Sequence, residues 1–355
     1  MTALDRLGIA LPIIQAPMAG TSTPALAAAV SNAGGLGSIG VGAVGAQDAQ
    51  AMIAAIRTAS NGSFNVNLFC NAPAVPDPER ERAWLDRLAP EFARFGAQPP
   101  AALREIYPSF VENDAMFAML LDQRPPVVSF HFGLPPGDRI AALRDAGAVL
   151  LATATSLDEG RLVAAAGIDM VVAQGYEAGG HRGVFDPHAA DARLGTMALT
   201  RLLVRELEVP VIAAGAIMDG AGIAAALVLG AVAAQMGTAF IGCPESQADS
   251  DYRAALFSPA AERTMIVSAI SGRPARCLAN RFTALAVDLP VADTPDYPIA
   301  YDAGKALNLA AKAAGEGGYG AQWAGQGAPF ARSLPAAELV AILMRERDQA
   351  GSGRE

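Results

Sequence analysis

The sequence contains little cysteine, few aromatic residues and few charged residues. Its cysteines, Cys70, Cys243 and Cys277, are far apart and form no C-x-x-C pair, which excludes a disulfide framework and argues against a zinc site. We therefore expect no bound metal. Aromatic residues make up 6% of the 355 residues and hydrophobic residues 52%, so the core has to be built mainly from alanine, valine, leucine and isoleucine.

Runs of basic residues and a secretory signal are also missing. The formal net charge is −9 and lysine and arginine form no cluster, so neither a nucleic acid nor a membrane is an expected partner. Asp5 comes early, and Pro12 interrupts the first short apolar stretch, unlike the pattern of a signal peptide. Together with the unpaired cysteines, this favours a cytoplasmic location.

One uncharged stretch, Gly220–Gly242, requires a membrane test. It is long enough to span a bilayer, for which about 20 apolar residues suffice. Gly230 divides it into an alanine-rich half typical of a helix and a second half typical of a strand that runs into a turn. A buried helix–strand pair is therefore the preferred interpretation.

Short apolar runs followed by helix-like segments recur along the chain. Thr23, Ser156 and Asp219 stand where helix N-caps are expected. Several runs are apolar on both faces, as strands of a buried parallel sheet are, and eight alternating units predict an α/β fold, the (β/α)₈ TIM barrel. A doubly wound sheet is the weaker alternative, because no G-x-G-x-x-G follows the first run. The runs are Pro12–Gln15, Leu36–Ile39, Phe64–Leu68, Val127–Phe130, Val149–Ala152, Asp169–Ala173, Pro210–Ala214 and Val232–Met236.

The chain is about a hundred residues longer than a typical barrel. One excess, residues 76–124, contains a charged helix, and the other forms a smaller helical insert or lid after the eighth strand. The predicted division is a barrel of residues 1–244 and 328–355 and a substrate-pocket insert of residues 245–327. The last seven residues, 349–355, are small and polar, and we expect them to fray.

The segment DMVVAQGYEAGGHRG, residues 169–183, is the most informative for function. Gln174 offers an amide at the end of a strand, and Gly179 and Gly180 allow the backbone to approach a flat ligand closely. His181 is suited to accept and return protons, because the pKa of a free imidazole lies near 6.5. An incidental histidine in a surface loop is the alternative. Function is favoured because the loop follows the carboxyl end of a strand, where barrel active sites lie.

The loops after the seventh and eighth strands predict a phosphate site. In barrels these loops, with the N-terminus of a short helix, often bind phosphate through backbone N–H groups. Gly215, Gly237 and Thr238 are the expected contacts; ordinary turns are the alternative. Such a site beside polar strand ends fits flavin mononucleotide (FMN). Met18 would pack on the flavin ring or fill the core, and Asn67 would bond the ring or serve the structure.

Further candidates are two histidines and a late helix. His131 ends the fourth strand as either a pocket residue or a hydrogen-bonded wall, and His188 lies in a polar loop that we expect to be exposed. Tyr301 and Lys305 share one helix face, with Tyr297 just before it. Phenols and one ammonium on a face suit a small anion, although a solvated amphipathic helix is the alternative.

Several motifs together resemble one family over nearly the whole chain. PIIQAPMAG, SFHFG, AQGYEAGGHRG, AAGAIMDG, QMGTAF and YGAQWAGQGA are similar to the nitronate monooxygenase (2-nitropropane dioxygenase) family. The resemblance implies an FMN-containing barrel that oxidises alkyl nitronates, such as propionate 3-nitronate, with molecular oxygen. Neutral nitroalkanes are a further class of substrate that it allows. It implies a flavin semiquinone, a carbonyl product with nitrite or nitrate, detoxification as the role, and no use of reduced nicotinamide.

The resemblance also assigns residues by position. His181 matches the catalytic histidine, and Ala216 stands where relatives commonly have a second glycine, which puts the geometry of the phosphate turn in doubt. The substrate pocket would comprise His131, Tyr297, Tyr301 and Lys305. The FMN contacts would be Met18, Asn67, Gln174, Gly179, Gly180, Gly215, Gln235, Met236, Gly237 and Thr238.

Two other functions stay open at the level of sequence. One is an NAD(P)H-dependent flavin reductase of quinones or enoyl thioesters on the same barrel. The other is a flavin-binding protein without catalysis. We expect a monomer or a homodimer in every case.

Overall fold

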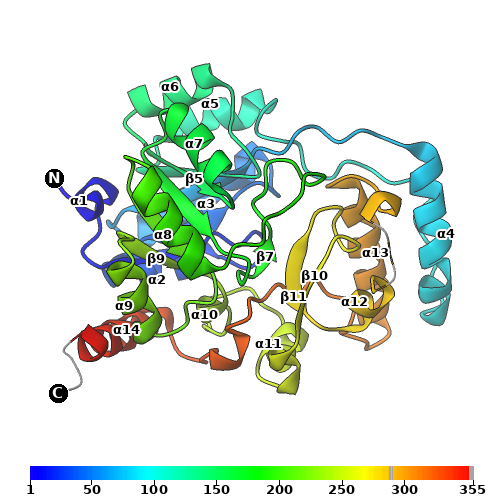
Figure 1. Ribbon diagram of the computed structural model, residues 1–355. Helices are drawn as coiled ribbons and strands as arrows, with labels where there is room; N and C mark the ends of the chain where they lie inside the picture. The colour runs from blue at the N-terminus through cyan, green and yellow to red at the C-terminus, as the bar shows by residue number, and fades with distance from the viewer. Residues whose placement is uncertain (288, 290, 352–355) are drawn as a thin grey trace.

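The computed structural model describes residues 1–287, 289 and 291–351 and contains a closed parallel barrel (Figure 1). Its 8-stranded sheet has the order β1-β9-β8-β6-β5-β4-β3-β2. A parallel bridge between Ile14 and Leu36 joins the two ends of this order, which confirms the predicted (β/α)₈ fold. Each predicted apolar run overlaps one of the strands, and β2 to β6 extend one or two residues beyond the run. The strands are β1 (Ile13–Gln15), β2 (Gly37–Gly40), β3 (Phe64–Phe69), β4 (Val127–His131), β5 (Val149–Ala154), β6 (Met170–Gln174), β8 (Val211–Ala214) and β9 (Ala233–Met236).

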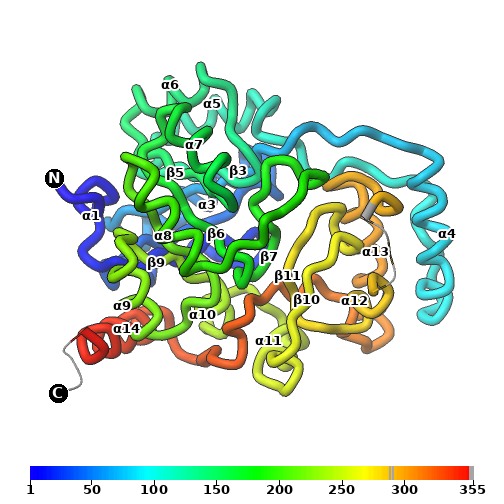
Figure 2. Tube along the Cα trace, in the orientation of Figure 1, coloured from blue at the N-terminus to red at the C-terminus, as the bar shows by residue number. Residues whose placement is uncertain are grey.

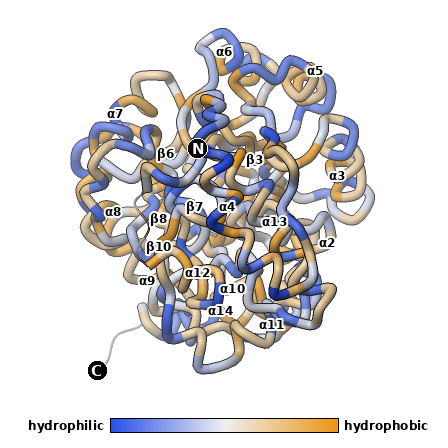
Figure 3. Tube along the Cα trace, turned by 90° about the vertical axis from the view of Figure 1, so that its right-hand side faces the viewer, coloured by the Kyte–Doolittle hydropathy of each residue, from blue (hydrophilic) through white to orange (hydrophobic). Residues whose placement is uncertain are grey.

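Helices surround the barrel, and the expected caps begin three of them. The side chains of Thr23, Ser156 and Asp219 accept hydrogen bonds from backbone N–H groups three residues further on. Apolar and polar segments alternate along peripheral helices such as α7 and α8 (Figure 3), as expected for helices with one face on a sheet. The helices on the barrel are α1 (Ala3–Leu7), α2 (Pro24–Asn32), α3 (Ala46–Ala59), α5 (Asp114–Gln123), α6 (Gly137–Asp145), α7 (Leu157–Ala165), α8 (Thr196–Glu206), α9 (Gly220–Val228) and α14 (Ala336–Gly351).

The segment after β9 contains strands as well as helices. Here β10 and β11 form a three-stranded antiparallel sheet with β7 (Gly180–His181), which belongs to the loop after β6. The expectation of a helical insert was therefore incomplete. The elements of this segment are α11 (Ser250–Leu256), η1 (Pro259–Glu262), β10 (Thr264–Val267), β11 (Ala275–Leu278), α12 (Arg281–Leu285), η2 (Val291–Asp293) and α13 (Ile299–Ala313), followed by η3 (Ala328–Phe330).

The two excess segments pack on each other beside the mouth of the barrel. Trp84 and Phe92 of α4 (Pro78–Arg94) share one apolar cluster with Phe282 and Leu307. Figure 2 shows α4 reaching across to α13 at the side of the molecule away from both termini. The chain therefore closes this side of the barrel with two separate excursions.

The uncharged stretch Gly220–Gly242 forms α9, β9 and the short α10 (Thr238–Ile241), as the helix–strand interpretation predicted. Within the described residues, no helix combines the length and apolar character that a membrane crossing requires. Helix α14 continues to Gly351, so the first part of the tail expected to fray is helical. The rest of that tail lies outside the described residues.

Candidate active site

A large cavity lies at the carboxyl ends of the barrel strands. Its volume is about 480 Å³, within the range usual for small-molecule and cofactor sites. Every residue assigned to the site from the sequence lines it. These residues are Met18, Asn67, His131, Gln174, Gly179, Gly180, His181, Gly215, Gln235, Met236, Gly237, Thr238, Tyr297, Tyr301 and Lys305. Their common location was predicted from the strand ends; their chemical roles remain predictions.

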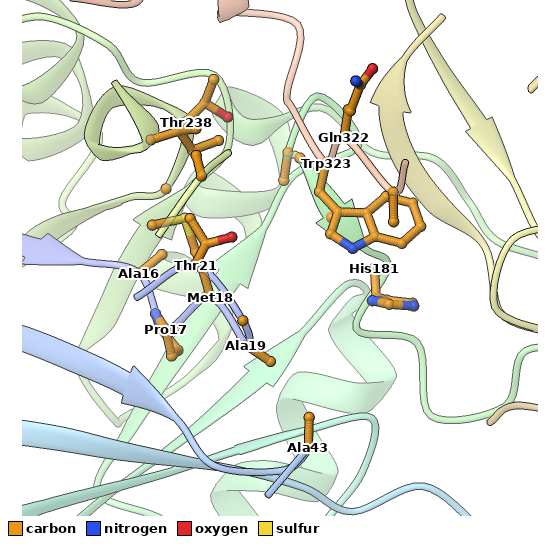
Figure 4. A pocket seen from close by; sticks show the side chains of 18 of the residues that line it. Ala16, Pro17, Met18, Ala19, Thr21, Ala43, His181, Thr238, Gln322 and Trp323 are labelled. Atoms are coloured by element: carbon orange, nitrogen blue, oxygen red, sulfur yellow. The ribbon is translucent and has the colours of Figure 1, made fainter. Parts of the chain in front are cut away.

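His181 stands between the barrel and the later insert. Its backbone pairs with Ala275 of β11, and its Nε2 lies 2.9 Å from the hydroxyl oxygen of Ser271. The ring is enclosed by aromatic side chains, with centroids 5.0 Å from Trp323 and 5.5 Å from Tyr297. In Figure 4, His181 and Trp323 face the loop from Ala16 to Thr21 across the cavity.

This enclosure determines the charge of the imidazole. Desolvation lowers the pKa of His181 to about 3, assisted by the nearby His131 and Arg273. The ring is consequently neutral at neutral pH, and a neutral imidazole has a lone pair able to accept a proton.

Two predicted ligand residues also hold the His181 loop. The Gln174 amide donates to the carbonyl of His181 at 2.9 Å and accepts from the N–H of Gly183 at 2.7 Å. His131 is a hydrogen-bonded wall residue, with its Nδ1 3.0 Å from the hydroxyl oxygen of Thr153 and its Nε2 3.3 Å from the carbonyl oxygen of His181. Burial lowers the pKa of His131 to about 4. Both side chains therefore orient the loop as well as line the cavity.

Gly179 is required for a reason that differs from the predicted one. A β-carbon at this position would lie 2.4 Å from the backbone nitrogen of Gly325. The loop after β6 thus packs directly on the backbone of the WAGQ segment, and a side chain would separate them. Close approach to a flat ligand was the reason inferred from the sequence; close approach to another backbone is the one the fold shows.

The loops after β8 and β9 form a second part of the cavity. Gly215 and Ala216 both have positive φ values, 130° and 52°. Thr238 begins α10, and its hydroxyl oxygen accepts from the N–H of Gly325 at 3.0 Å. The first amides of a helix have no intrahelical acceptor, so this corner offers N–H groups of the kind that bind phosphate oxygens.

Met18 and Asn67 make structural contacts and also line the cavity; their contact with a flavin ring stays a prediction. The Met18 side chain packs on two apolar clusters, and its sulfur would lie 3.6 Å from a β-carbon at Gly237. The Asn67 amide nitrogen donates to the hydroxyl oxygen of Ser129 at 2.9 Å. Both residues are therefore structural and also line the cavity.

The late helix brings phenols and an ammonium to the same cavity. The Lys305 nitrogen lies 4.8 Å from the ring centroid of Tyr107 and 5.5 Å from that of Tyr301, distances typical of cation–π contacts. Burial raises the pKa values of Tyr297 and Tyr301 well above the ordinary value, so both phenols stay protonated and can donate hydrogen bonds. His188 is exposed, as expected.

Among the site residues not assigned from the sequence, three contact the rings of His181 or Tyr301 or the ammonium of Lys305. Trp323 lies in the quoted WAGQ motif, which was the available signal, although no role was given to it. Tyr107 belongs to the excess segment 76–124 and lines the cavity from there. Ser271 belongs to no motif, and its bond to His181 depends on folding of the insert onto the loop after β6.

Comparisons with known proteins agree on one family. The nitronate monooxygenase family model matches residues 2–346. The chain is 62% identical to a protein named nitronate monooxygenase from Paraburkholderia phytofirmans, over 98% of this chain and 94% of that one. It is 58% identical to a protein of the same name from Pseudomonas aeruginosa, over 96% and 97% of the two chains.

Solved structures give a consistent result. The structure of nitroalkane oxidase from Streptomyces ansochromogenes superposes with a TM-score of 0.89 and 40% identity, and 99% of each chain is covered. FabK from Thermotoga maritima is a more distant match, with a TM-score of 0.74 and 29% identity over 98% of this chain and 96% of that one.

Proposed function

The chain belongs to the nitronate monooxygenase family, and from this premise we propose that it oxidises alkyl nitronates with molecular oxygen, using FMN. The observation that carries the proposal is the meeting of three features in one cavity. These are a neutral imidazole, a group of phenols with one lysine, and glycine-rich turns suited to a phosphate. The first two suit an anionic nitro compound, and the third suits the phosphate of the cofactor.

The volume of the cavity, about 480 Å³, supports a bound cofactor, and the groups at its two ends suit the phosphate and the ring of FMN. Gly215, Gly237 and Thr238 would hold the phosphate, since backbone N–H groups and the start of α10 meet there. Met18 and Asn67 would contact the ring, supplying a polarizable sulfur and an amide. When bound, FMN would serve as the electron acceptor for the substrate and would pass the electrons on to oxygen.

The remaining residues would bind the substrate and move its proton. Lys305 would hold a carboxylate such as that of propionate 3-nitronate, and the phenols of Tyr297 and Tyr301 would donate to nitro oxygens. With a neutral nitroalkane, His181 takes the proton from the carbon beside the nitro group. The electron pair of that C–H bond then moves into the nitro group, which produces the nitronate. The aromatic rings around His181 keep bulk water from this exchange.

Oxygen uptake by the FMN-loaded protein tests the proposal. We expect oxygen consumption with propionate 3-nitronate, and no anaerobic bleaching of the flavin by NADH or NADPH. Rapid bleaching by a reduced nicotinamide without nitronate-dependent uptake would instead support a reductase of quinones or enoyl thioesters. A yellow protein that shows neither reaction would be a flavin-binding protein without catalysis.

A further inference from the structure

We infer that the turn Ser268–Arg273 fixes His181 as a neutral imidazole protonated on Nε2, which leaves the lone pair of Nδ1 for the substrate proton. The inference rests on the proposed function only for the use of that lone pair. The tautomer itself follows from hydrogen bonding around Ser271, a positioning residue whose hydroxyl contacts Nε2 of the imidazole.

The Ser271 hydroxyl is fully buried and has three polar neighbours. Its oxygen lies 2.9 Å from Nε2 of His181, the hydroxyl donates to the carbonyl of Arg273 at 3.3 Å, and the oxygen accepts from the N–H of Arg273 at 3.5 Å. A carbonyl can only accept, and a serine hydroxyl has a single proton. We assign that proton to the Arg273 carbonyl, which can only accept, so that the serine oxygen acts as the acceptor toward His181. Nε2 must then carry the hydrogen.

The turn is itself held in place. The N–H groups of Ser271 and Gly272 both donate to the carbonyl of Ser268, at 3.2 and 2.7 Å. The serine oxygen therefore has a defined position when the imidazole meets it. Nδ1 of His181 has no hydrogen-bond partner within the described part of the chain, and the residue lines the cavity.

The surrounding charges favour the neutral ring. The Arg273 guanidinium is 3% exposed and lies 4.4 Å from the ring centroid of Phe132, which is 5.5 Å from that of His181. Arg273 forms no direct ion pair within residues 1–287, 289 and 291–351, and the carboxylates of Glu159 and Asp186 act on its charge only from a distance. A second positive charge on the imidazole would be repelled, in agreement with the lowered pKa of His181. The titratable or charged groups around His181 are His131 of β4, Arg182 next to it in the chain, Arg273 of the turn, Tyr297 before α13, and Tyr301 and Lys305 on α13.

The tautomer can be measured directly because the chain has only three histidines. We would label histidine with ¹⁵N in the FMN-loaded protein and record two-bond ¹H–¹⁵N correlation spectra from pH 8 to pH 5. The His181→Asn variant identifies the His181 signals by their loss. We expect the pattern of the Nε2-protonated neutral ring over the whole pH range.

Two variants separate the role of Ser271 from a general effect on the turn. In Ser271→Ala, we expect signals of both tautomers and about a tenfold loss of nitroalkane oxidation, the order expected when one buried hydrogen bond is lost. Oxidation of preformed nitronate should change much less. The matched control is Ser268→Ala in the same turn, since that hydroxyl makes no side-chain hydrogen bond to the described residues. It should leave both the spectrum and the activity unchanged.

The outcomes distinguish this inference from the proposed function. An Nδ1-protonated or positively charged His181 at pH 7, or a Ser271→Ala spectrum identical to that of the parent protein, would overturn the inference even if nitronates are oxidised. The expected tautomer and its response to Ser271→Ala in a protein that oxidises no nitronate would support the positioning role and reject the proposed reaction.

Discussion

At position 216 the backbone adopts a left-handed conformation that favours glycine. Ala216 has φ of 52° and lines the cavity beside Gly215. A non-glycine residue pays roughly 1–2 kcal/mol for this conformation, and the greater freedom of glycine in the unfolded chain cancels part of any gain from replacing it. We predict that Ala216→Gly stabilises the protein by about 0.5–1 kcal/mol, measured by urea unfolding, and tightens FMN binding by a small factor.

Arg124 provides the control for position 216. It also has a positive φ, 44°, but it is the C-cap of α5 and does not line the cavity. Arg124→Gly should therefore change stability without changing FMN affinity. An Ala216→Gly protein that binds FMN more weakly than the parent would show that the methyl group contributes to the phosphate turn.

Replacement of His181 separates proton abstraction from the later oxidation. A nitroalkane must lose the proton on the carbon beside its nitro group before it is oxidised, whereas a preformed nitronate has already lost that proton. General-base catalysis contributes about 10²–10⁴-fold, so His181→Asn should lower kcat/KM for nitroethane by about that factor and change the value for preformed nitronate much less. Oxygen uptake with both substrates measures the split, and equal losses would contradict the base role.

The residues predicted from the sequence share one property, which is that they follow strand ends or occupy recognisable motifs. His181, Gln174 and Thr238 could be placed on one face because all parallel strands of a barrel end there. Ser271 could not, because its contact with His181 joins two segments that only the tertiary fold brings together. The double use of Gln174, in the loop and in the cavity, was likewise not visible in its sequence context.

At the scale of elements, the barrel strands were predictable and the strands of the insert were not. The core strands are buried on both faces and read as continuous apolar runs. β11 has the sequence ARCL and includes the buried Arg276, whose guanidinium donates to the carbonyl of Tyr176 at 2.8 Å. Such a strand lacks the apolar signal, because it contains a buried arginine whose guanidinium is hydrogen-bonded to a loop distant in the chain.

The contact between the loop after β6 and the WAGQ segment gives a prediction at the same scale. A β-carbon at Gly179 would come 2.4 Å from the nitrogen of Gly325, so one of the two backbones has to move. We expect Gly179→Ala to weaken FMN binding by about tenfold or more and to destabilise the protein by about 1–3 kcal/mol. Fluorescence titration of flavin and thermal unfolding would measure these effects.

Gly137 is the matched control for this substitution. A β-carbon there would meet nothing within 4 Å, and the residue begins α6. Gly137→Ala should leave FMN affinity unchanged, and alanine is the better helix former. If Gly179→Ala binds FMN as tightly as this control, the two segments are not packed as closely as the structure indicates.

For the whole molecule, the two enclosed histidines make stability depend on pH in a defined window. Burial lowers the pKa of His131 to about 4 and that of His181 to about 3, whereas an unfolded imidazole titrates near 6.5. Above pH 6.5 both states are neutral, so pH has little effect. Between about pH 6.5 and 4 the unfolded chain binds protons that the folded protein does not, and stability is lost as the pH falls.

We therefore predict that the free energy of unfolding decreases from pH 6.5 to pH 5 by up to about 1.4 kcal/mol per pH unit for each of the two histidines. Most carboxyl groups titrate below this window, so they contribute little to the slope. His131→Gln should lower the slope by roughly half, because one of the two protons is removed from the balance. His188→Gln should leave it unchanged, since His188 is exposed. Urea unfolding at constant saturating FMN gives the slopes, and an equal slope for His131→Gln and the parent protein would show that His131 is not held neutral by the fold.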